Sequence, residues 1–480
     1  MHLFFPNKAY SGLPAYASSY FSSEGEREEK KLLYLSIMNS YLRKKHIKRF
    51  FLIFILFTVV TVTGIVAMKR AEHMIQSGAE DESYPEIVPL NHLIDNNMSA
   101  LEQTVRFDND IQRFMREWDI KGGSFALMYN DSLLYAKGYG YANIKDSVPC
   151  DVSHLFRVAS ISKLITAVAI MHLCETGALS LNRTVFGEKG ILNDSLFLDI
   201  RHKNIRKITV DHLLRHTGGF SSPIGDPAFN MEGVARVLGK PLPLTTDDMV
   251  QYASQNKLRS VPGTHYKYSN LGYIVLSKVV EKITGINYET YIRDSILAPI
   301  GCFDMYLGKN FSNNRKENEV AYYEVEDAAP VAAFDGSGKM VMKSNGGNNV
   351  ACLSGAGGWI ASPVELLRLV AAINNNPGKP DILSKETIRK MTAADKRQKP
   401  IGWANVTTKE WFRSGSMAGT SALIKKQKDG YTWVFISNSS SWNGPNLPKR
   451  MSTAISRAIS RVKEWPKRDL FYQPSISRNR

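Results

Sequence analysis

The residues best suited to chemistry are a serine and a lysine three positions apart, in the run Ser160-Ile161-Ser162-Lys163. A serine hydroxyl is a poor nucleophile at neutral pH and needs a neighbouring base and donors that stabilise an oxyanion. Residues three apart lie on one face of a helix, so a helix beginning at Ser160 brings Lys163 within reach. The spacing indicates nucleophilic catalysis; the alternative is an N-capping serine followed by a first-turn lysine.

The sequence after Ser160 predicts that helix. Apolar side chains recur at helical spacing, and Gly177 stands where a C-terminal cap belongs. The predicted stripe consists of Ile165, Val168, Ala169, His172 and Leu173. The N-terminus of such a helix adds a partial positive charge and free N–H groups beside the serine.

Tyr268-Ser269-Asn270 opens a second predicted helix, which ends at Gly285. A tyrosine at a helix start can present its phenol to a neighbouring site, and near two cations the phenol can lose its proton and act as a base. The Asn270 amide can donate to a substrate carbonyl. Taken alone, the motif is better explained by a half-buried tyrosine with Ser269 or Asn270 as the N-cap.

A third segment, residues 411–420, reads as a strand that edges the same site. It continues into a hairpin over residues 421–438, with the Asp429-Gly430 turn between two apolar runs.

Four motifs, in order, resemble those of the serine β-lactamase-like family of penicillin-recognising hydrolases, in the branch of class C β-lactamases, D-Ala-D-Ala carboxypeptidases, D-aminopeptidases and esterases. The similar segments are residues 156–163 around the serine, Leu213-Leu214-Arg215-His216-Thr217-Gly218-Gly219, Tyr268-Ser269-Asn270, and Gly357-Gly358-Trp359-Ile360-Ala361-Ser362. The resemblance covers roughly residues 103–465.

The resemblance implies a site. Ser160 is the expected nucleophile, and Lys163 and Tyr268 share the acid and base work. The backbone N–H groups of Ser160 and Ser416 are expected to form the oxyanion hole, while Asn270, Arg413, Ser414, Gly415 and Ser416 bind substrate.

One motif departs from the family pattern. The family keeps K-T-G or H-x-G on the third segment, and this chain has Arg413-Ser414-Gly415. Arginine keeps the charge but cannot give up its proton, and its planar guanidinium suits a carboxylate. We therefore expect Arg413 to clamp a substrate carboxylate. The departure also leaves open a sensor or binding protein with little or no turnover.

The same sequence predicts an α+β fold. A hairpin over residues 124–137 and the one over 421–438 come from opposite ends of the domain, with helices between them. This order suggests one antiparallel sheet flanked by helices, with a helical subdomain on one side. Ser362-Pro363-Val364-Glu365 reads as a capping box, and residues 451–462 as a last amphipathic helix.

An uncharged apolar run, Phe50–Met68, is long enough to span a bilayer. Basic residues gather before it, so residues 1–49 are expected in the cytoplasm and the hydrolase domain outside, periplasmic or extracellular. A cleaved signal peptide is the rival, and Met38 could be the true start. Residues 69–102 read as a linker, 103–465 as the hydrolase domain and 466–480 as a basic, disordered tail.

Composition narrows the function classes. The formal net charge is +16, yet no nucleic-acid reader motif is visible, so anionic lipid or cell-wall polymer is the simpler partner. The four cysteines are widely spaced, which suggests no metal or redox site and leaves disulfides open. His212 and His216 lack the glutamate of a zinc hydrolase motif. We expect no metal and no cofactor, and a membrane-anchored serine hydrolase acting on D-Ala peptides, β-lactams or esters.

Overall fold

The computed structural model describes residues 87–376, 381–395 and 398–472. The predicted cytoplasmic segment and the predicted membrane segment lie outside these residues. Within them, no helix is long and apolar enough to cross a membrane.

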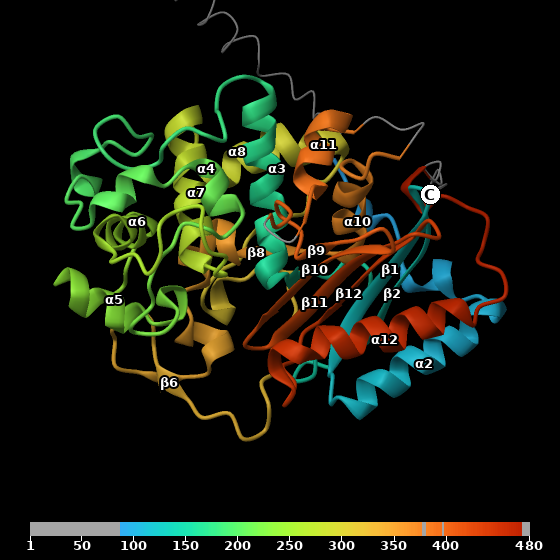
Figure 1. The fold of residues 1–480 in the computed structure, drawn as a ribbon. Helices are drawn as coiled ribbons and strands as arrows, with labels where there is room; N and C mark the ends of the chain where they lie inside the picture. The colour runs from blue at the N-terminus through green and yellow to red at the C-terminus, as the bar shows by residue number, and fades with distance from the viewer. Residues whose placement is uncertain (1–86, 377–380, 396–397, 473–480) are drawn as a thin grey trace, which may run out of the picture. The chain divides into compact units, whose positions relative to one another are not determined.

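A seven-stranded antiparallel sheet, in the order β3-β2-β1-β12-β11-β10-β9, organises the described chain (Figure 1). Its strands are β1 Gly122–Tyr129, β2 Ser132–Asn143, β3 Val148–Pro149, β9 Asn405–Val406, β10 Glu410–Met417, β11 Thr420–Gln427 and β12 Tyr431–Ser437. The two predicted hairpins meet at the centre, where β1 pairs with β12 from Gly123↔Ser437 to Tyr129↔Tyr431. The mixed α/β prediction, with one sheet closed by the two ends of the domain, is confirmed.

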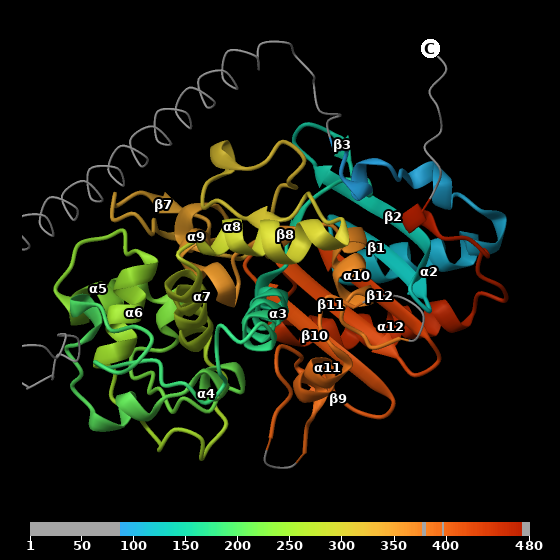
Figure 2. The ribbon, with the colours of Figure 1, turned by 90° about the horizontal axis from the view of Figure 1, so that it is seen from above.

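Helices cover both faces of the sheet. On one face lie α2 (Val105–Glu117) and α12 (Leu447–Ser460) (Figure 2). Their apolar side chains form a buried cluster with aromatic residues of the strands. On the other lie α3 (Ser162–Glu175), α10 (Pro363–Ala371) and α11 (Lys385–Thr392). The predicted helical subdomain stands beside the sheet and consists of α4 Val210–Leu214, α5 Met231–Leu238, α6 Thr246–Gln255, α7 Asn270–Thr284, α8 Tyr288–Ile292 and α9 Val350–Leu353.

Two small sheets complete the architecture. One joins β4 (Phe156–Arg157), β8 (Trp359–Ala361) and β5 (Tyr306–Leu307), and the other joins β6 (Val331–Ala332) and β7 (Met340–Val341). Because β4 immediately precedes Ser160, its pairing with β8 fixes the chain at the entrance to the nucleophile segment.

The predicted helix after Ser160 is confirmed as α3, and Ile165, Val168, Ala169 and Leu173 of its predicted stripe are buried, but the burial extends beyond the stripe. All ten residues from Ser162 to Met171 are buried, because α3 runs through the middle of the domain and not along its surface. One of the two hydrogen bonds of the predicted capping box is confirmed: the Ser362 hydroxyl accepts from the Glu365 N–H. The Glu365 carboxylate, however, accepts from Phe303 N–H and Asp304 N–H at 2.8 and 2.9 Å.

The compact unit is larger than the predicted 103–465. Part of the predicted linker packs onto the sheet side of the molecule, since Ile94 is 3% exposed and Asn96 accepts from the Gly138 N–H. Part of the predicted disordered tail also packs against the folded domain. Arg468 donates to the Leu134 carbonyl at 2.8 Å, and Leu470 and Phe471 are buried.

Candidate active site

Ser160 lies in a 3-10 turn, Ala159–Ile161, between β4 and the start of α3 at Ser162. The predicted helix start is therefore two residues early, yet Lys163 still follows on the first turn. Ala159 has a φ of 46°, a left-handed conformation that is costly for any residue with a side chain. Such strain typically costs on the order of 1–3 kcal/mol and is concentrated at functional sites.

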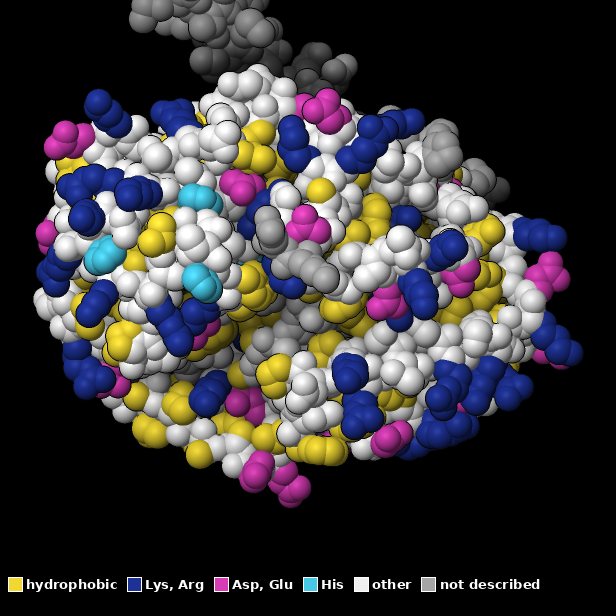
Figure 3. All heavy atoms as spheres, in the orientation of Figure 1, with side chains coloured by type: hydrophobic (Ala, Val, Ile, Leu, Met, Phe, Trp, Pro, Cys, Tyr) yellow, Lys and Arg dark blue, Asp and Glu magenta, His cyan; other side chains and the backbone are white. Residues whose placement is uncertain are grey.

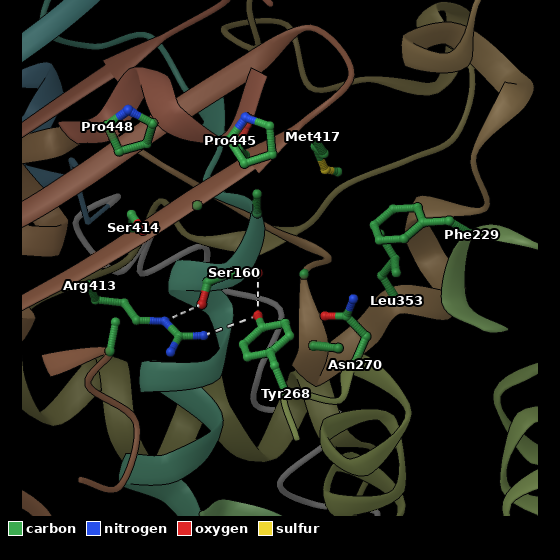
Figure 4. A pocket seen from close by; sticks show the side chains of 16 residues that line it. Ser160, Phe229, Tyr268, Asn270, Leu353, Arg413, Ser414, Met417, Pro445 and Pro448 are labelled. Atoms are coloured by element: carbon green, nitrogen blue, oxygen red, sulfur yellow. Dashed lines mark hydrogen bonds between the residues drawn. The ribbon is translucent and has the colours of Figure 1, made fainter. Parts of the chain in front are cut away.

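The hydroxyl of Ser160 meets both predicted partners. Its Oγ lies 2.7 Å from the Tyr268 hydroxyl and accepts from Lys163 Nζ at 3.2 Å. Residues from two separate helix starts are thus brought to hydrogen-bond distance, as the sequence predicts (Figure 4).

Lys163 is fully buried and donates three hydrogen bonds: to Ser160 Oγ, to Asn270 Oδ1 at 2.6 Å, and to the Ala356 carbonyl. Burial lowers the pKa of its amine to about 8; Tyr268 opposes that shift, and the charge of Arg413 adds to it. Three acceptors around one nitrogen require all three protons, so the geometry fits the ammonium form.

Tyr268 directly precedes the N-cap of α7, Ser269, whose hydroxyl accepts from the Gly272 N–H. Burial works to raise the pKa of the phenol, but the charges of Lys163 and Arg413 outweigh it and lower the pKa to about 8. The ring of His216 packs against the Tyr268 ring, with centroids 4.5 Å apart. The Nδ1 of His216 accepts from the Ser269 N–H. The hydrogen bond joins the segment that contains His216 to the start of α7.

Asn270 is engaged at both ends of its amide. Its Oδ1 accepts from Lys163, and its Nδ2 donates to Asp226 Oδ2 at 2.6 Å. The expected donation to a substrate carbonyl stays a prediction. What the structure adds is Asp226, which the sequence analysis missed: it stands in an irregular loop, and no spacing signal links it to Asn270.

Arg413 lies on β10 with its side chain turned towards the nucleophile. It is 3% exposed, its Nε donates to the Ser160 carbonyl at 2.7 Å, and one of its terminal nitrogens donates to the Tyr268 hydroxyl at 3.4 Å. Part of the guanidinium is therefore committed to the protein. Clamping of a substrate carboxylate by Arg413 stays a prediction.

Ser414, Gly415 and Ser416 follow on the same strand and line one cavity of about 280 Å³ together with Ser160 and Tyr268. A Cβ at Gly415 would stand 2.2 Å from the Val158 carbonyl oxygen and 2.9 Å from the Ser160 nitrogen. Glycine is thus required for β10 to lie against the nucleophile turn. Ser160 and Ser416 both line this cavity, and the oxyanion hole that their backbone N–H groups are expected to form stays a prediction.

Several residues that line the cavity were not predicted individually. Phe229, Leu353, Met417, Pro445 and Pro448 come from four separate segments, of which only residues 411–420 were predicted to edge the site, and they give the cavity an apolar wall. The glycine-rich run 354–358 is close-packed: a Cβ at Gly355 would stand 2.7 Å from the Thr166 hydroxyl.

His212 and the four cysteines do not belong to this cluster. His212 caps α4 through Nδ1, which accepts from the Thr209 N–H. Each of the four cysteines, all of them within the described residues, is free.

A Ser–Lys–Tyr cluster at the junction of an antiparallel sheet and a helical subdomain is the arrangement typical of the serine β-lactamase-fold hydrolase family. The comparisons agree: a family model described as beta-lactamase matches residues 107–455. The chain belongs to the beta-lactamase family.

Relatives by sequence are distant. Protein flp of Staphylococcus aureus (strain MRSA252) is 25% identical over 230 residues, which are 48% of this chain and 42% of that protein. Penicillin-binding protein 4* of Bacillus subtilis (strain 168) is 29% identical over 197 residues, 41% of this chain and 40% of that protein. The matched region therefore spans less than half the length of these curated relatives.

Among solved structures, the D-amino acid amidase from Ochrobactrum anthropi SV3, in complex with L-phenylalanine amide, superposes with a TM-score of 0.58 at 18% identity. The match covers 76% of this chain and all of that chain. At this identity the likeness shows the fold alone.

Proposed function

We propose that this protein is a membrane-anchored serine hydrolase that cleaves amide or ester bonds through an acyl-enzyme. The observation that carries the proposal is the contact of Ser160 Oγ with the Tyr268 hydroxyl at 2.7 Å and with Lys163 Nζ at 3.2 Å.

In the proposed first step, the Ser160 oxygen attacks the substrate carbonyl carbon while its proton passes to the Tyr268 phenolate. Lys163 is a poorer base because its three donated hydrogen bonds occupy all three protons of the ammonium. Its charge and that of Arg413 instead stabilise the phenolate, as the lowered pKa of Tyr268 indicates.

The tetrahedral intermediate then collapses. The bond to the leaving group breaks, the leaving group takes the proton from Tyr268, and the acyl group stays on Ser160. Water gives a proton to the same phenolate and attacks the ester. As the bond between the acyl carbon and Ser160 Oγ breaks, Tyr268 returns the proton to Ser160 Oγ, and the acid is released.

The acylated residue is directly testable. A fluorophosphonate probe should label the peptide that contains Ser160, and Ser160→Ala should abolish labelling with almost no change in melting temperature. Labelling that survives this substitution contradicts the mechanism.

A sensor or binding protein with little turnover is the second candidate. The replacement of the family's lysine or histidine by Arg413 favours it. An activated ester separates the two: a hydrolase gives linear steady-state turnover, whereas a sensor gives one equivalent of product and then stalls.

Anchoring in the membrane rests on the apolar run Phe50–Met68 and the basic residues before it. The test uses a reporter enzyme that is active only after export, fused directly after residue 86. This junction leaves out the packed segment that begins at residue 87. We expect that reporter to be active. Activity of a cytoplasm-only reporter at the same junction would reverse the proposed topology.

A further inference from the structure

The two cationic side chains near Ser160, those of Arg413 and Lys163, already donate hydrogen bonds to oxygen atoms of the protein. Among the described residues that line the cavity, Arg413 is the only one with a charged side chain, and it donates to the Ser160 carbonyl and the Tyr268 hydroxyl. In Figure 4 it lies on one side of Ser160 and Tyr268, while Phe229 and Leu353 lie on the other. Lys163 is fully buried beneath the cavity with its three hydrogen bonds directed at protein oxygens.

Negative charge already matches this positive charge. The Asp226 carboxylate accepts a hydrogen bond from the Asn270 amide, and in the proposed mechanism Tyr268 acts as a phenolate. Two cations thus face two anions. A substrate carboxylate placed beside them would be an extra, unpaired charge in a partly enclosed site, which is a costly arrangement.

The open wall of the cavity is apolar. Phe229, Leu353, Met417, Pro445 and Pro448 line it, and Figure 3 shows hydrophobic side chains around the recess in the middle of this face. Phe229 also lines a neighbouring cavity of about 460 Å³, whose wall combines Met231, Leu242 and Phe334 with the charged Glu232 and Lys343. The apolar wall next to Ser160 is therefore that of the first cavity alone.

We infer that the groups flanking the scissile bond of the substrate are uncharged and apolar, as in neutral esters and amides, and not the free carboxylate of a D-Ala-ending peptide. This inference rests on the proposed acyl-enzyme function and narrows its substrate class. It replaces the role of carboxylate clamp for Arg413 with that of a cation that organises Ser160 and Tyr268.

A matched pair of thioesters tests the inference in the full-length protein. Both carry a phenylacetyl group; one has a thioglycolate leaving group with its carboxylate, and the other has the methyl ester of that leaving group. We expect kcat/KM to favour the neutral thioester by at least about tenfold, equivalent to roughly 1.4 kcal/mol. Equal rates, or a preference for the carboxylate, overturn the inference.

A cation introduced into the wall gives a second readout. Met417→Lys places an amine on the apolar side of the cavity, and the ratio of kcat/KM for the neutral over the charged thioester should fall at least about fivefold. Met417→Leu, a volume-conserving control, should keep the ratio within about twofold. An unchanged ratio in a Met417→Lys variant that melts like the wild type contradicts the inference.

Failure of the proposed hydrolase function gives a different result from failure of this inference. If neither thioester acylates Ser160 by mass spectrometry, the hydrolase proposal falls, and this inference falls with it. If both acylate Ser160 and a preference for the carboxylate disappears in Arg413→Lys, the hydrolase stands, and Arg413 is a carboxylate clamp after all.

Discussion

At the scale of residues, the site is a coupled set of charges around one hydroxyl. Tyr268 and Lys163 each have a pKa of about 8, one lowered by neighbouring cations and the other lowered chiefly by burial. The working form needs a phenolate and an ammonium together. The rate of acylation should therefore rise towards pH 8 as the phenol ionises and fall above it as the amine deprotonates, with the two limbs belonging to the pair.

Removing Arg413 should move this profile to higher pH. Its charge lowers the pKa of both Tyr268 and Lys163, so Arg413→Ala should raise both. On the acidic limb, a phenol pKa that is higher by about 1 lowers the rate at pH 7 about tenfold. Profiles of kcat/KM against pH for a neutral ester measure this, and Arg413→Lys should return the profile towards the wild type. A loss of rate with an unmoved profile would show that Arg413 does not act through these two groups.

The proximity of the three central side chains could be predicted, because local sequence patterns place each of them at a helix start. Ser160, Lys163 and Tyr268 each stand at a helix start, and the sequence marks such starts through capping residues and apolar periodicity. Asp226 and the apolar wall could not be predicted, because they meet the site only through long-range packing of loops. The direction of the Arg413 side chain was equally hidden, since a strand pattern does not say which groups a guanidinium meets.

At the scale of elements, the close approach of β10 to the nucleophile turn sets the geometry of the site. We expect Gly415→Ala to force the two apart, because the new Cβ would stand 2.2 Å from the Val158 carbonyl oxygen. Overpacking of this kind costs about 1–3 kcal/mol in stability, and acylation of Ser160 should fall by about a hundredfold or more. Thermal unfolding and probe labelling measure the two effects.

Gly272→Ala is the matched control for that change. It lies within α7 near the same site, and the nearest atom to its added Cβ is 3.6 Å away, an ordinary contact. Stability and labelling should both stay close to the wild type. Full labelling of Gly415→Ala would show that the strand and the turn can separate without loss of the site.

Element types were predictable, but their surroundings were not. The end of α7 at Gly285 is confirmed, with Gly285 in the left-handed region at φ 70°. The burial of α3 on all sides was not predicted, because its partners Asn270 and Gly355 come from distant segments that no local pattern links to it. In the fold, Lys163 donates to Asn270, and Thr166 donates to the Gly355 carbonyl at 2.8 Å.

At the scale of the whole molecule, both ends of the described chain pack on β2. The Asp469 carboxylate accepts from the Leu133 N–H at 2.9 Å, and Arg468 donates to the Met98 carbonyl at 2.6 Å, which ties the C-terminal segment to the N-terminal one. The basic composition of residues 466–480 concealed this, because a short polar segment can be held by backbone acceptors that no sequence pattern reveals.

Two truncations follow from this packing. Ending the chain at residue 465 removes Arg468 with its carbonyl contacts and exposes the apolar surface that Leu470 and Phe471 cover. Burial of one large apolar side chain is worth about 1.5–3 kcal/mol, so the melting temperature should fall by several degrees. Ending the chain at residue 472 keeps those contacts and should melt like the wild type. Differential scanning calorimetry compares the two, and equal melting temperatures would mean that residues 466–472 add nothing to the stability of the domain, as a disordered tail would.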